Sequence, residues 1–383
     1  MKFNINDSTL AKFYANADML RTYINNSAML RTNFGFWATQ FTVDPSITPT
    51  DSHGAATYTV ESVLKELTPM ADMRAPLGRP KALDKEGTAF RTGSIPHFIA
   101  PSYRENAFEA YYNREVESFY GADKQLLMQW TDDVQSKIDS LDQTLSNMAA
   151  QTLSTGQIDY KYGRGIKGFV QDIVLPAENK VNAGEKVWTA ADCKILTQMA
   201  KIEEDFRMRT GFEGAMKWQI PYDIFHNTFL TNGEVIEWVR TSKAVQGIVM
   251  PELTFITEDD AMEALNKYGK VSPIEIIVEK QKDLNKGTVK GWKDGVAVLR
   301  PVGYAGVIKH ASNFDRLMHE AFGADNVTKL FSNVGNSGLY TLCNITRNNG
   351  DYKEFTTEVM GQFIPVLTEF PYHIIVNTQA AGE

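Results

Sequence analysis

The chain has 383 residues, of which 43% are hydrophobic and 22% charged, so it can bury the core of a folded protein with two or three domains. Its formal net charge of −8 at pH 7 excludes a general basic field for nucleic-acid phosphates, although a local basic patch stays compatible with it. No stretch approaches the roughly 18 consecutive apolar residues of a membrane-spanning helix.

The first twenty residues lack the apolar run of a signal peptide, so we expect a cytoplasm-like compartment and no membrane partner. The two cysteines, Cys193 and Cys343, are far apart and in no paired motif. We therefore interpret both as reduced residues and expect no disulfide.

The N-terminal third is polar and rich in turn-forming residues. Residues 2–31 have weak helical spacing, and 33–59 is irregular. This pattern is typical of an ordinary terminal segment, and also of an arm that lies on a neighbouring molecule. Residues 61–120 then mix prolines with basic side chains, and alternating runs on either side of Asp84–Gly87 predict a long β-hairpin. The basic residues fit a solvated hairpin face or a loop that meets acidic surface on another subunit.

A single long helix is predicted over 122–155. Its apolar residues recur at steps of mostly three and four, which places them on one stripe: Leu127, Trp130, Val134, Ile138, Leu141, Leu145, Met148 and Leu153. Gly156 follows as a C-terminal cap. At 1.5 Å per residue, this helix is roughly 50 Å long. A helix of that length with one narrow stripe requires an extended partner alongside it.

Two strands are predicted, at 157–162 and 168–175. They are joined by the stretch Gly163-Arg164-Gly165-Ile166-Lys167-Gly168. This spacing is formally G-x-G-x-x-G, but a dinucleotide site needs a helix after the glycines. A β-branched run follows instead, so we predict a hairpin and no nucleotide. Thr189 and Asp192 resemble a capping box that opens a helix over 187–209.

The second half of the chain mixes helices and strands. Short helices are expected at 221–227 and 234–243, and another helix follows Thr257. Strands are expected at 274–280, 295–310, 338–347 and 352–362, with a charged loop at 282–294 and a partly helical segment at 313–331. The predicted class is α+β.

A search for chemistry finds no active site. The six histidines form no H-x-H or H-x-x-x-H pair, no zinc pattern or G-x-S-x-G elbow occurs, and no phosphate-binding loop is present. The acidic runs Glu203–Asp205 and Glu258–Asp260 fit helix surfaces better than catalysis. We therefore predict no catalytic, cofactor-binding or metal-binding residues, and a structural or interaction protein.

The order of these parts resembles the major capsid proteins of tailed bacteriophages, which share the fold named after phage Hong Kong ninety-seven. The local match is best to the lambda-like branch, the major capsid protein E family. It rests on LTPMADMRAPLGRP, AFRTGSIPHFIAPSY, LSNMAAQTLSTGQIDY, Trp188–Asp192 and GVAVLRPVGYAGVI. The step from the long helix through Leu-Ser-Thr-Gly-Gln-Ile into a strand is the most specific of these.

The resemblance implies five parts of the chain. Residues 1–60 would be an N-terminal arm, 61–120 an extended loop, 121–212 a peripheral domain with its spine helix, 213–340 an axial domain, and 341–383 C-terminal strands that return to the peripheral domain.

The resemblance also implies a function and a set of partners. The chain would be a non-enzymatic protein that assembles into hexamers and pentamers of an icosahedral shell, with a separate scaffolding protein, a portal and a decoration protein as further partners. Packaged DNA would lie near it without specific contacts. The protein would reside in the virion, and in the host cytoplasm during assembly. Because some relatives form Lys–Asn cross-links, Lys81 and Lys85 are candidates for that reaction.

Two alternatives stay open at this point. One is another shell of the same fold, such as an encapsulin-like compartment. The other is an α+β enzyme whose site is assembled from scattered residues such as Asp223, His226 and Glu237.

Overall fold

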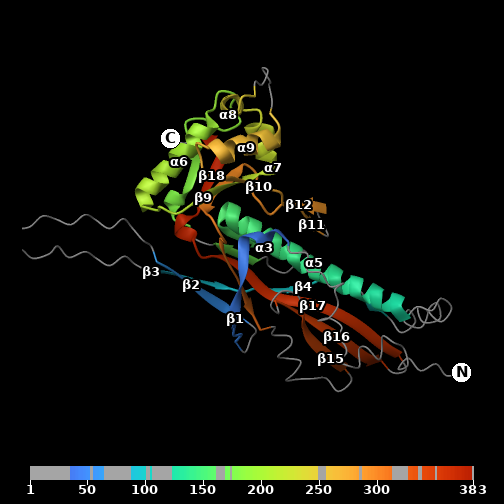
Figure 1. The fold of residues 1–383 in the computed structure, drawn as a ribbon. Coiled ribbons are helices and arrows are strands. Elements are labelled where there is room, and N and C mark those ends of the chain that lie inside the picture. The colour runs from blue at the N-terminus through green and yellow to red at the C-terminus, as the bar shows by residue number, and fades with distance from the viewer. Residues whose placement is uncertain are drawn as a thin grey trace, which may run out of the picture. The chain divides into compact units, whose positions relative to one another are not determined.

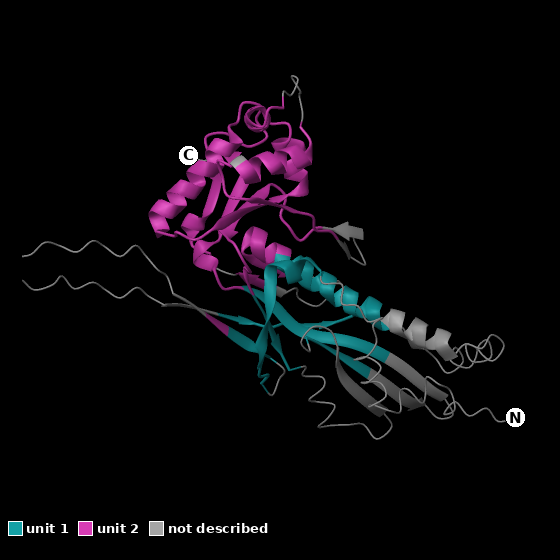
Figure 2. Cartoon of the chain, viewed as in Figure 1, with its two compact units in different colours: residues 1–58, 92–149, 307–366 teal, residues 59–91, 150–306, 367–383 magenta. Residues whose placement is uncertain are grey.

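The computed structural model divides into two compact units, which are coloured separately in Figure 2. Unit 1 comprises 1–58, 92–149 and 307–366, and unit 2 comprises 59–91, 150–306 and 367–383. The structure describes residues 35–51, 55–63, 88–100, 104–105, 123–160, 169–172, 175–248, 256–283, 287–312, 327–334, 339–349 and 352–381. The predicted hairpin turn at 85–87, the candidate Lys81 and Lys85, and most of the predicted N-terminal arm lie outside these residues.

A seven-stranded sheet is the centre of unit 1 (Figure 1). Its main path, in spatial order, is β1 (Phe41–Thr48), β14 (Gly306–Ala311), β17 (Tyr352–Leu367), β16 (Tyr340–Asn349) and β15 (Val327–Val334). The short strands β4 (His97–Ile99) and β5 (Arg104–Glu105) pair with β17 in antiparallel register. The sheet thus joins segments from the beginning, middle and end of the chain. Separately, β2 (Thr57–Val63) and β3 (Thr88–Ser94) form a two-stranded sheet.

The long helix α5 (Asp123–Thr155) confirms the prediction for 122–155 within one residue. The predicted stripe is buried wherever side chains are described, at Val134, Ile138, Leu141, Leu145, Met148 and Leu153. Gly156, at φ 68°, ends the helix and donates its N–H to the Thr152 carbonyl at 3.1 Å. A left-handed residue without a Cβ is favoured at that position.

Within unit 1, α5 lies against the sheet and against the short helix α3 (Phe36–Gln40). The Lys137 ammonium donates to the Thr357 carbonyl of β17 at 3.0 Å, and the Tyr340 hydroxyl of β16 donates to Asp142. Trp37 of α3 is 2% exposed and donates its indole N–H to Asp142 Oδ1 at 3.3 Å. The sheet is thus the extended partner that the stripe requires.

A five-stranded sheet with helices on one face forms unit 2. Its order is β10 (Ile274–Ile277), β9 (Met216–Pro221), β13 (Val296–Pro301), β18 (Ile374–Ala381) and β8 (Lys180–Ala183). Alternate residues of these strands pack in one apolar core with α6 (Ile195–Thr210), α8 (Gly233–Val245) and α9 (Glu258–Tyr268). The period of two along each strand sends the remaining side chains to the opposite face.

Several short elements complete the described structure. β6 (Gln157–Tyr160) and β7 (Phe169–Asp172) pair antiparallel, which confirms the predicted hairpin pairing. Residues 220–230 contain α7 (Tyr222–Ile224) and the π-helical segment η3 (Phe225–Phe229). Two 3₁₀ turns, η2 (Ala177–Asn179) and η5 (Phe370–Tyr372), contact each other through the Asn179 side-chain amide, which donates to the Pro371 carbonyl at 2.8 Å.

Four predicted segments were wrong in detail. Residues 33–59 contain α3, β1 and part of β2, because Trp37 and Phe41 are buried and β1 pairs with β14. The charged loop at 282–294 contains a hairpin of β11 (Gln281–Asp283) and β12 (Gly287–Val289). Of the segment predicted at 313–331 as helical in part, the structure describes 327–331, and these residues belong to β15. In each case pairing with a distant or adjacent strand overrides local propensity.

The fourth is the helix predicted over 187–209, which begins at Ile195 rather than after Thr189. The Asp192 carboxylate pairs with Lys186 instead of capping a helix. Further along the chain, the predicted C-terminal strands fall in two sheets: β16 and β17 join the seven-stranded sheet, whereas β18 pairs with β13 and β8.

Leu145→Ala should lower the free energy of unfolding by about 3 kcal/mol, because it removes a fully buried side chain from the α5 stripe. Ser136→Ala, at an exposed position of the same helix, should change it by less than about 0.5 kcal/mol. Urea unfolding followed by circular dichroism measures both. Equal effects of the two substitutions would show that the stripe is not buried.

Candidate functional site

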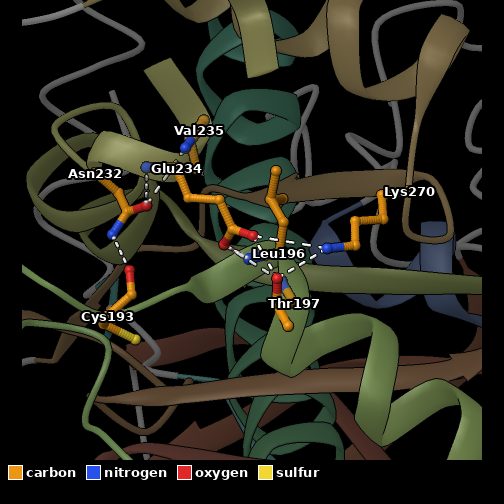
Figure 3. Close-up of polar contacts among 7 residues, drawn as sticks. All are labelled: Cys193, Leu196, Thr197, Asn232, Glu234, Val235 and Lys270. Carbon is orange, nitrogen blue, oxygen red and sulfur yellow. Dashed lines mark hydrogen bonds and ion pairs between the residues drawn. The ribbon is translucent and has the colours of Figure 1, made fainter. Parts of the chain in front are cut away.

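The most connected polar cluster in unit 2 lies where α6 and α8 begin (Figure 3). Asn232 is the N-cap of α8: its Oδ1 accepts from the backbone N–H groups of Glu234 at 3.0 Å and Val235 at 3.3 Å. The side-chain N–H₂ of Asn232 donates to the Cys193 carbonyl at 2.8 Å, just before α6. One side chain therefore caps one helix and fixes the entry to another.

Glu234 caps α6 from the neighbouring helix. Its Oε2 accepts from the backbone N–H of Leu196 at 2.8 Å and of Thr197 at 3.3 Å, and its Oε1 accepts from the Thr197 hydroxyl at 2.5 Å. Lys270, in the loop after α9, lies 3.7 Å from Glu234 Oε1 and donates to the Thr197 hydroxyl at 2.8 Å. A carboxylate at a helix N-terminus satisfies free N–H groups and complements the helix dipole.

This cluster is structural rather than catalytic. Both carboxylate oxygens of Glu234 accept hydrogen bonds from the groups they hold in place. The nearby Cys193 thiol is buried, and burial, with Glu234 and Asp192 nearby, raises its pKa, which disfavours the nucleophilic thiolate. Sequence reasoning missed Glu234, because Leu196, whose N–H it accepts, lies 38 residues earlier in the chain.

The residues considered for an enzyme site each have a different partner. Asp223 pairs with Lys290, and His226 Nε2 lies 2.8 Å from Glu258 Oε2. Glu237 is exposed and lies 3.7 Å from Arg240 on its own helix. This arrangement gives no nucleophile–base pair among the three. Cys193 and Cys343 are both buried, and they form no disulfide with each other.

Both acidic runs have structural partners. Glu203 accepts from the Trp218 indole N–H at 2.5 Å and from both the N–H and the hydroxyl of Ser272 at 2.8 Å. Asp260 donates its N–H to the Thr257 hydroxyl, the N-cap of α9, at 3.2 Å, and its carboxylate lies 3.1 Å from the Lys243 ammonium. These contacts fix helices to neighbouring elements.

Two clefts lined by described residues of unit 2 could hold a ligand. The smaller, of about 240 Å³, lies at the carboxyl ends of the parallel strands β9 and β10, where ligands bind in many α/β proteins. Its Asp223 and Lys290 pair with each other, and its Glu279 accepts the N–H groups of Gly291 and Trp292. The larger, of about 660 Å³, is lined mainly by amides and hydroxyls, with Lys180 and Lys293.

Neither cleft combines a nucleophile with a base. Across the described ranges, no three histidine, cysteine, aspartate or glutamate side chains are placed to hold a metal ion. The G-x-G-x-x-G stretch at 163–168 lies outside the described residues, but the segment after it is the strand β7, as predicted. Among the helices that the structure describes, none has the length and apolarity needed to cross a membrane.

Buried ionisable groups in unit 2 also have structural contacts. The Arg300 guanidinium, 1% exposed, donates to Gln219 Oε1 at 3.1 Å and to the Gly303 carbonyl at 2.9 Å. Burial lowers its pKa to about 10, so it stays charged at pH 7. His373 donates from Nε2 to the Leu153 carbonyl at 2.7 Å, and burial lowers its pKa to about 4, so it is neutral at pH 7.

The comparisons with known proteins identify the fold. No model of a protein family matches the sequence, and no curated protein sequence matches it. Among solved structures, a prophage protein of Escherichia coli CFT073, assigned as a capsid protein, is 13% identical with a TM-score of 0.51, over 94% of this chain and 98% of that chain.

Two further similar structures have lower TM-scores. A phage-related protein of Bordetella bronchiseptica RB50 is 14% identical, with a TM-score of 0.48, over 94% of this chain and 96% of that chain. The capsid structure of cyanophage P-SCSP1u is 11% identical, with a TM-score of 0.35, over 90% of this chain and 89% of that chain.

The similarity to the Escherichia coli prophage protein extends over nearly the whole length of both chains. The chain therefore has an α+β phage capsid fold, of the Hong Kong ninety-seven type that the resemblance predicted, and the predicted fold class is confirmed.

Glu234→Ala should lower the free energy of unfolding by about 1–2 kcal/mol, because the first N–H groups of α6 lose their acceptor. Glu234→Gln keeps one acceptor oxygen and should cost less. Glu237→Ala, on the exposed side of the same helix, is the matched control and should have little effect. Urea titration measures the free energy of unfolding of the three variants. A loss for Glu237→Ala as large as that for Glu234→Ala would contradict the capping role of Glu234.

His373 should make unit 2 less stable at acid pH. Because its pKa is about 4 in the folded state and about 6.5 when unfolded, the unfolded chain binds the extra proton between these values. The stabilisation is complete above pH 6.5, falls as the pH drops, and has decreased by about 2 kcal/mol at pH 5. Hydrogen exchange of β18 between pH 5 and 8 measures it. In His373→Gln this loss of stability at acid pH should disappear. If it persists, another group is responsible for it.

Proposed function

We propose that this chain is the major capsid protein of a tailed phage, and that copies of it assemble into the hexamers and pentamers of an icosahedral shell around double-stranded DNA. The single observation that carries the proposal is the capsid fold shared over 94% of this chain with the prophage protein assigned as a capsid protein. A match over nearly full length leaves little of the chain for a separate activity. We infer that it is not an enzyme.

The polar contacts of the described residues support a structural role. Glu234, Glu203 and Asp260 each cap or join elements, and each of the residues considered for catalysis pairs with a different residue. Such contacts keep a lobe rigid, and a rigid lobe can present the same surface to every neighbour in a ring. A closed ring of five or six copies requires a heterologous contact that repeats with a constant rotation.

We assign the parts of the chain within this proposal as follows. Within the predicted 1–60 arm, β1 belongs to the seven-stranded sheet, so we assign the arm to the residues before α3. Residues 61–120 act as an extended loop that contacts neighbouring subunits, with β4 and β5 paired to that sheet. The seven-stranded sheet and most of α5 form the peripheral domain. The axial domain is built on the five-stranded sheet with α6, α8 and α9, and the C-terminal strand β18 belongs to that sheet.

Further partners and locations belong to the same proposal. A separate scaffolding protein would guide assembly, a portal would occupy one vertex, and a decoration protein would bind the outer surface. The protein would be found in the virion, after assembly in the host cytoplasm. With a net charge of −8, it would leave the packaged DNA free of strong, non-specific binding.

Assembly is tested by expressing the full chain, alone and with the phage's scaffolding protein, and separating the products on a gradient before negative-stain electron microscopy. We expect shells, rings or sheets. A variant in which a short Gly-Ser linker replaces 65–86 leaves every strand of both larger sheets intact and should remain unassembled, with an unchanged circular dichroism spectrum. A wild-type chain that stays monomeric in every condition would contradict the proposal.

Lys–Asn cross-linking has a separate readout. If Lys81 or Lys85 forms such bonds, boiled denaturing gels of assembled particles should show multiples of the 43.0 kDa subunit. The Lys81→Arg/Lys85→Arg variant should then show one band at the subunit mass. A single band from wild-type particles would exclude cross-linking and leave shell assembly unaffected.

A further inference from the structure

The buried carboxyl group of Asp142 is the strongest feature that the capsid role does not explain. Asp142 lies in the middle of α5, and its side chain is 4% exposed. One oxygen, Oδ1, accepts from the Trp37 indole N–H at 3.3 Å and from the Tyr340 hydroxyl. The three residues belong to α3, α5 and β16, so one carboxyl oxygen joins three elements of unit 1.

The other oxygen of Asp142 has no hydrogen-bond partner among the described residues, although it is buried. An ionised carboxylate needs partners for both oxygens, and burying it without them is costly. Protonation at the free oxygen removes the charge, and an unpartnered hydroxyl costs less to bury than an unpartnered charge. The geometry therefore favours the neutral acid.

The surrounding charges also favour the neutral form of Asp142. Among the described residues, Asp139, one turn earlier on α5, is the charge that raises the pKa of Asp142, because it repels a second negative charge. Tyr340, on β16, is a neutral donor, and burial together with Asp142 raises its pKa well above the usual value. The helix α3 has the sequence FWATQ and supplies no charge. Burial outweighs the two hydrogen bonds and raises the pKa of Asp142 to about 6.

The contacts of α3 show what Asp142 holds in place. Besides the indole contact, the Trp37 N–H lies 3.5 Å from the Ser146 hydroxyl, one turn along α5. A Cβ added at Gly35 would lie 2.2 Å from Ser146 Oγ and 3.4 Å from the Asp142 carbonyl oxygen, so only glycine fits this close approach. α3 therefore depends on a small area of α5 centred on Asp142 and Ser146.

We propose that Asp142 is a proton-controlled latch: its neutral form holds α3, and with it the segment that leads into β1, against α5, and its ionised form weakens that hold. Nothing in this proposal depends on shell assembly, so it can be tested on the unassembled chain. The segment concerned, 35–41, connects the predicted N-terminal arm to the sheet of unit 1. A change of pH would thereby alter how firmly the arm is anchored.

The latch predicts a defined pH profile for hydrogen exchange. If detachment of α3 lowered the pKa of Asp142 from about 6 to the ordinary 3.8, the detached fraction would rise about fiftyfold between pH 4 and pH 7 and level off above that. This is the upper limit, because Tyr340 of β16 still contacts the carboxyl group when α3 is detached. Asp44 in the adjacent strand β1 does not contribute in this window, because its pKa is about 2: burial raises it, but hydrogen bonds from Lys309 and Ser46 lower it more.

The experiment measures exchange protection at Ala38 and Phe41, whose N–H groups bond to the Gly35 and Trp37 carbonyls, corrected for the intrinsic pH dependence of exchange. In Asp142→Asn the change between pH 4 and 7 should fall to less than about twofold. Wild-type protection that does not change with pH, or a change of the wild-type size that persists in Asp142→Asn, would overturn the proposal.

Two variants keep the test decisive if Asp142→Asn fails to fold. Asp139→Asn removes the repelling charge. It should lower the pH at which the detached fraction of α3 levels off. Tyr340→Phe removes a donor to the carboxylate and should raise that pH. Shifts in opposite directions support the latch, whereas unmoved profiles, or shifts in the same direction, contradict it.

Discussion

The structure depends on the burial of one side of a single long helix. An isolated helix of 33 residues gains little stability from its own hydrogen bonds, and a stripe of leucine, isoleucine, valine and methionine side chains would be exposed without a partner. In unit 1 the partner is a sheet whose strands come from distant parts of the chain. The helix therefore cannot be stable until those segments have come together, and loss of one strand weakens the rest.

Polar groups buried beside this apolar stripe decide how the elements are aligned. Apolar packing has little directional preference, but the Lys137 ammonium reaches a single β17 carbonyl, and Asp142 joins α3 to β16. Unit 2 uses the same principle, since Glu234 of α8 caps α6 and Asn232 caps α8. Each of these contacts is satisfied in one arrangement only, which makes the two folded units specific as well as stable.

The sequence predicted those features whose signals are local. The 3.6-residue period of α5, Gly156 as its cap, the hairpin of β6 and β7, and the strands β10, β13, β16 and β17 follow from spacing alone. It did not predict β1 or β15, because β1 becomes a strand by pairing with the distant β14, and β15 by pairing with the following strand β16. It also placed the start of α6 too early, since the cap of that helix comes from Glu234. Asp142 lies outside the predicted apolar stripe and carried no prediction, because only the folded structure brings Trp37 and Tyr340 to it.

The proposed capsid role rests on the fold rather than on any cluster of reactive side chains, so the direct test is to see the chain in an assembly. A reconstruction by electron cryomicroscopy of purified particles would show it. The result predicted here is a shell of five- and six-membered rings in which each subunit contains α5 as one continuous helix over 123–155. Particles without such rings, or a helix broken within that range, would contradict it.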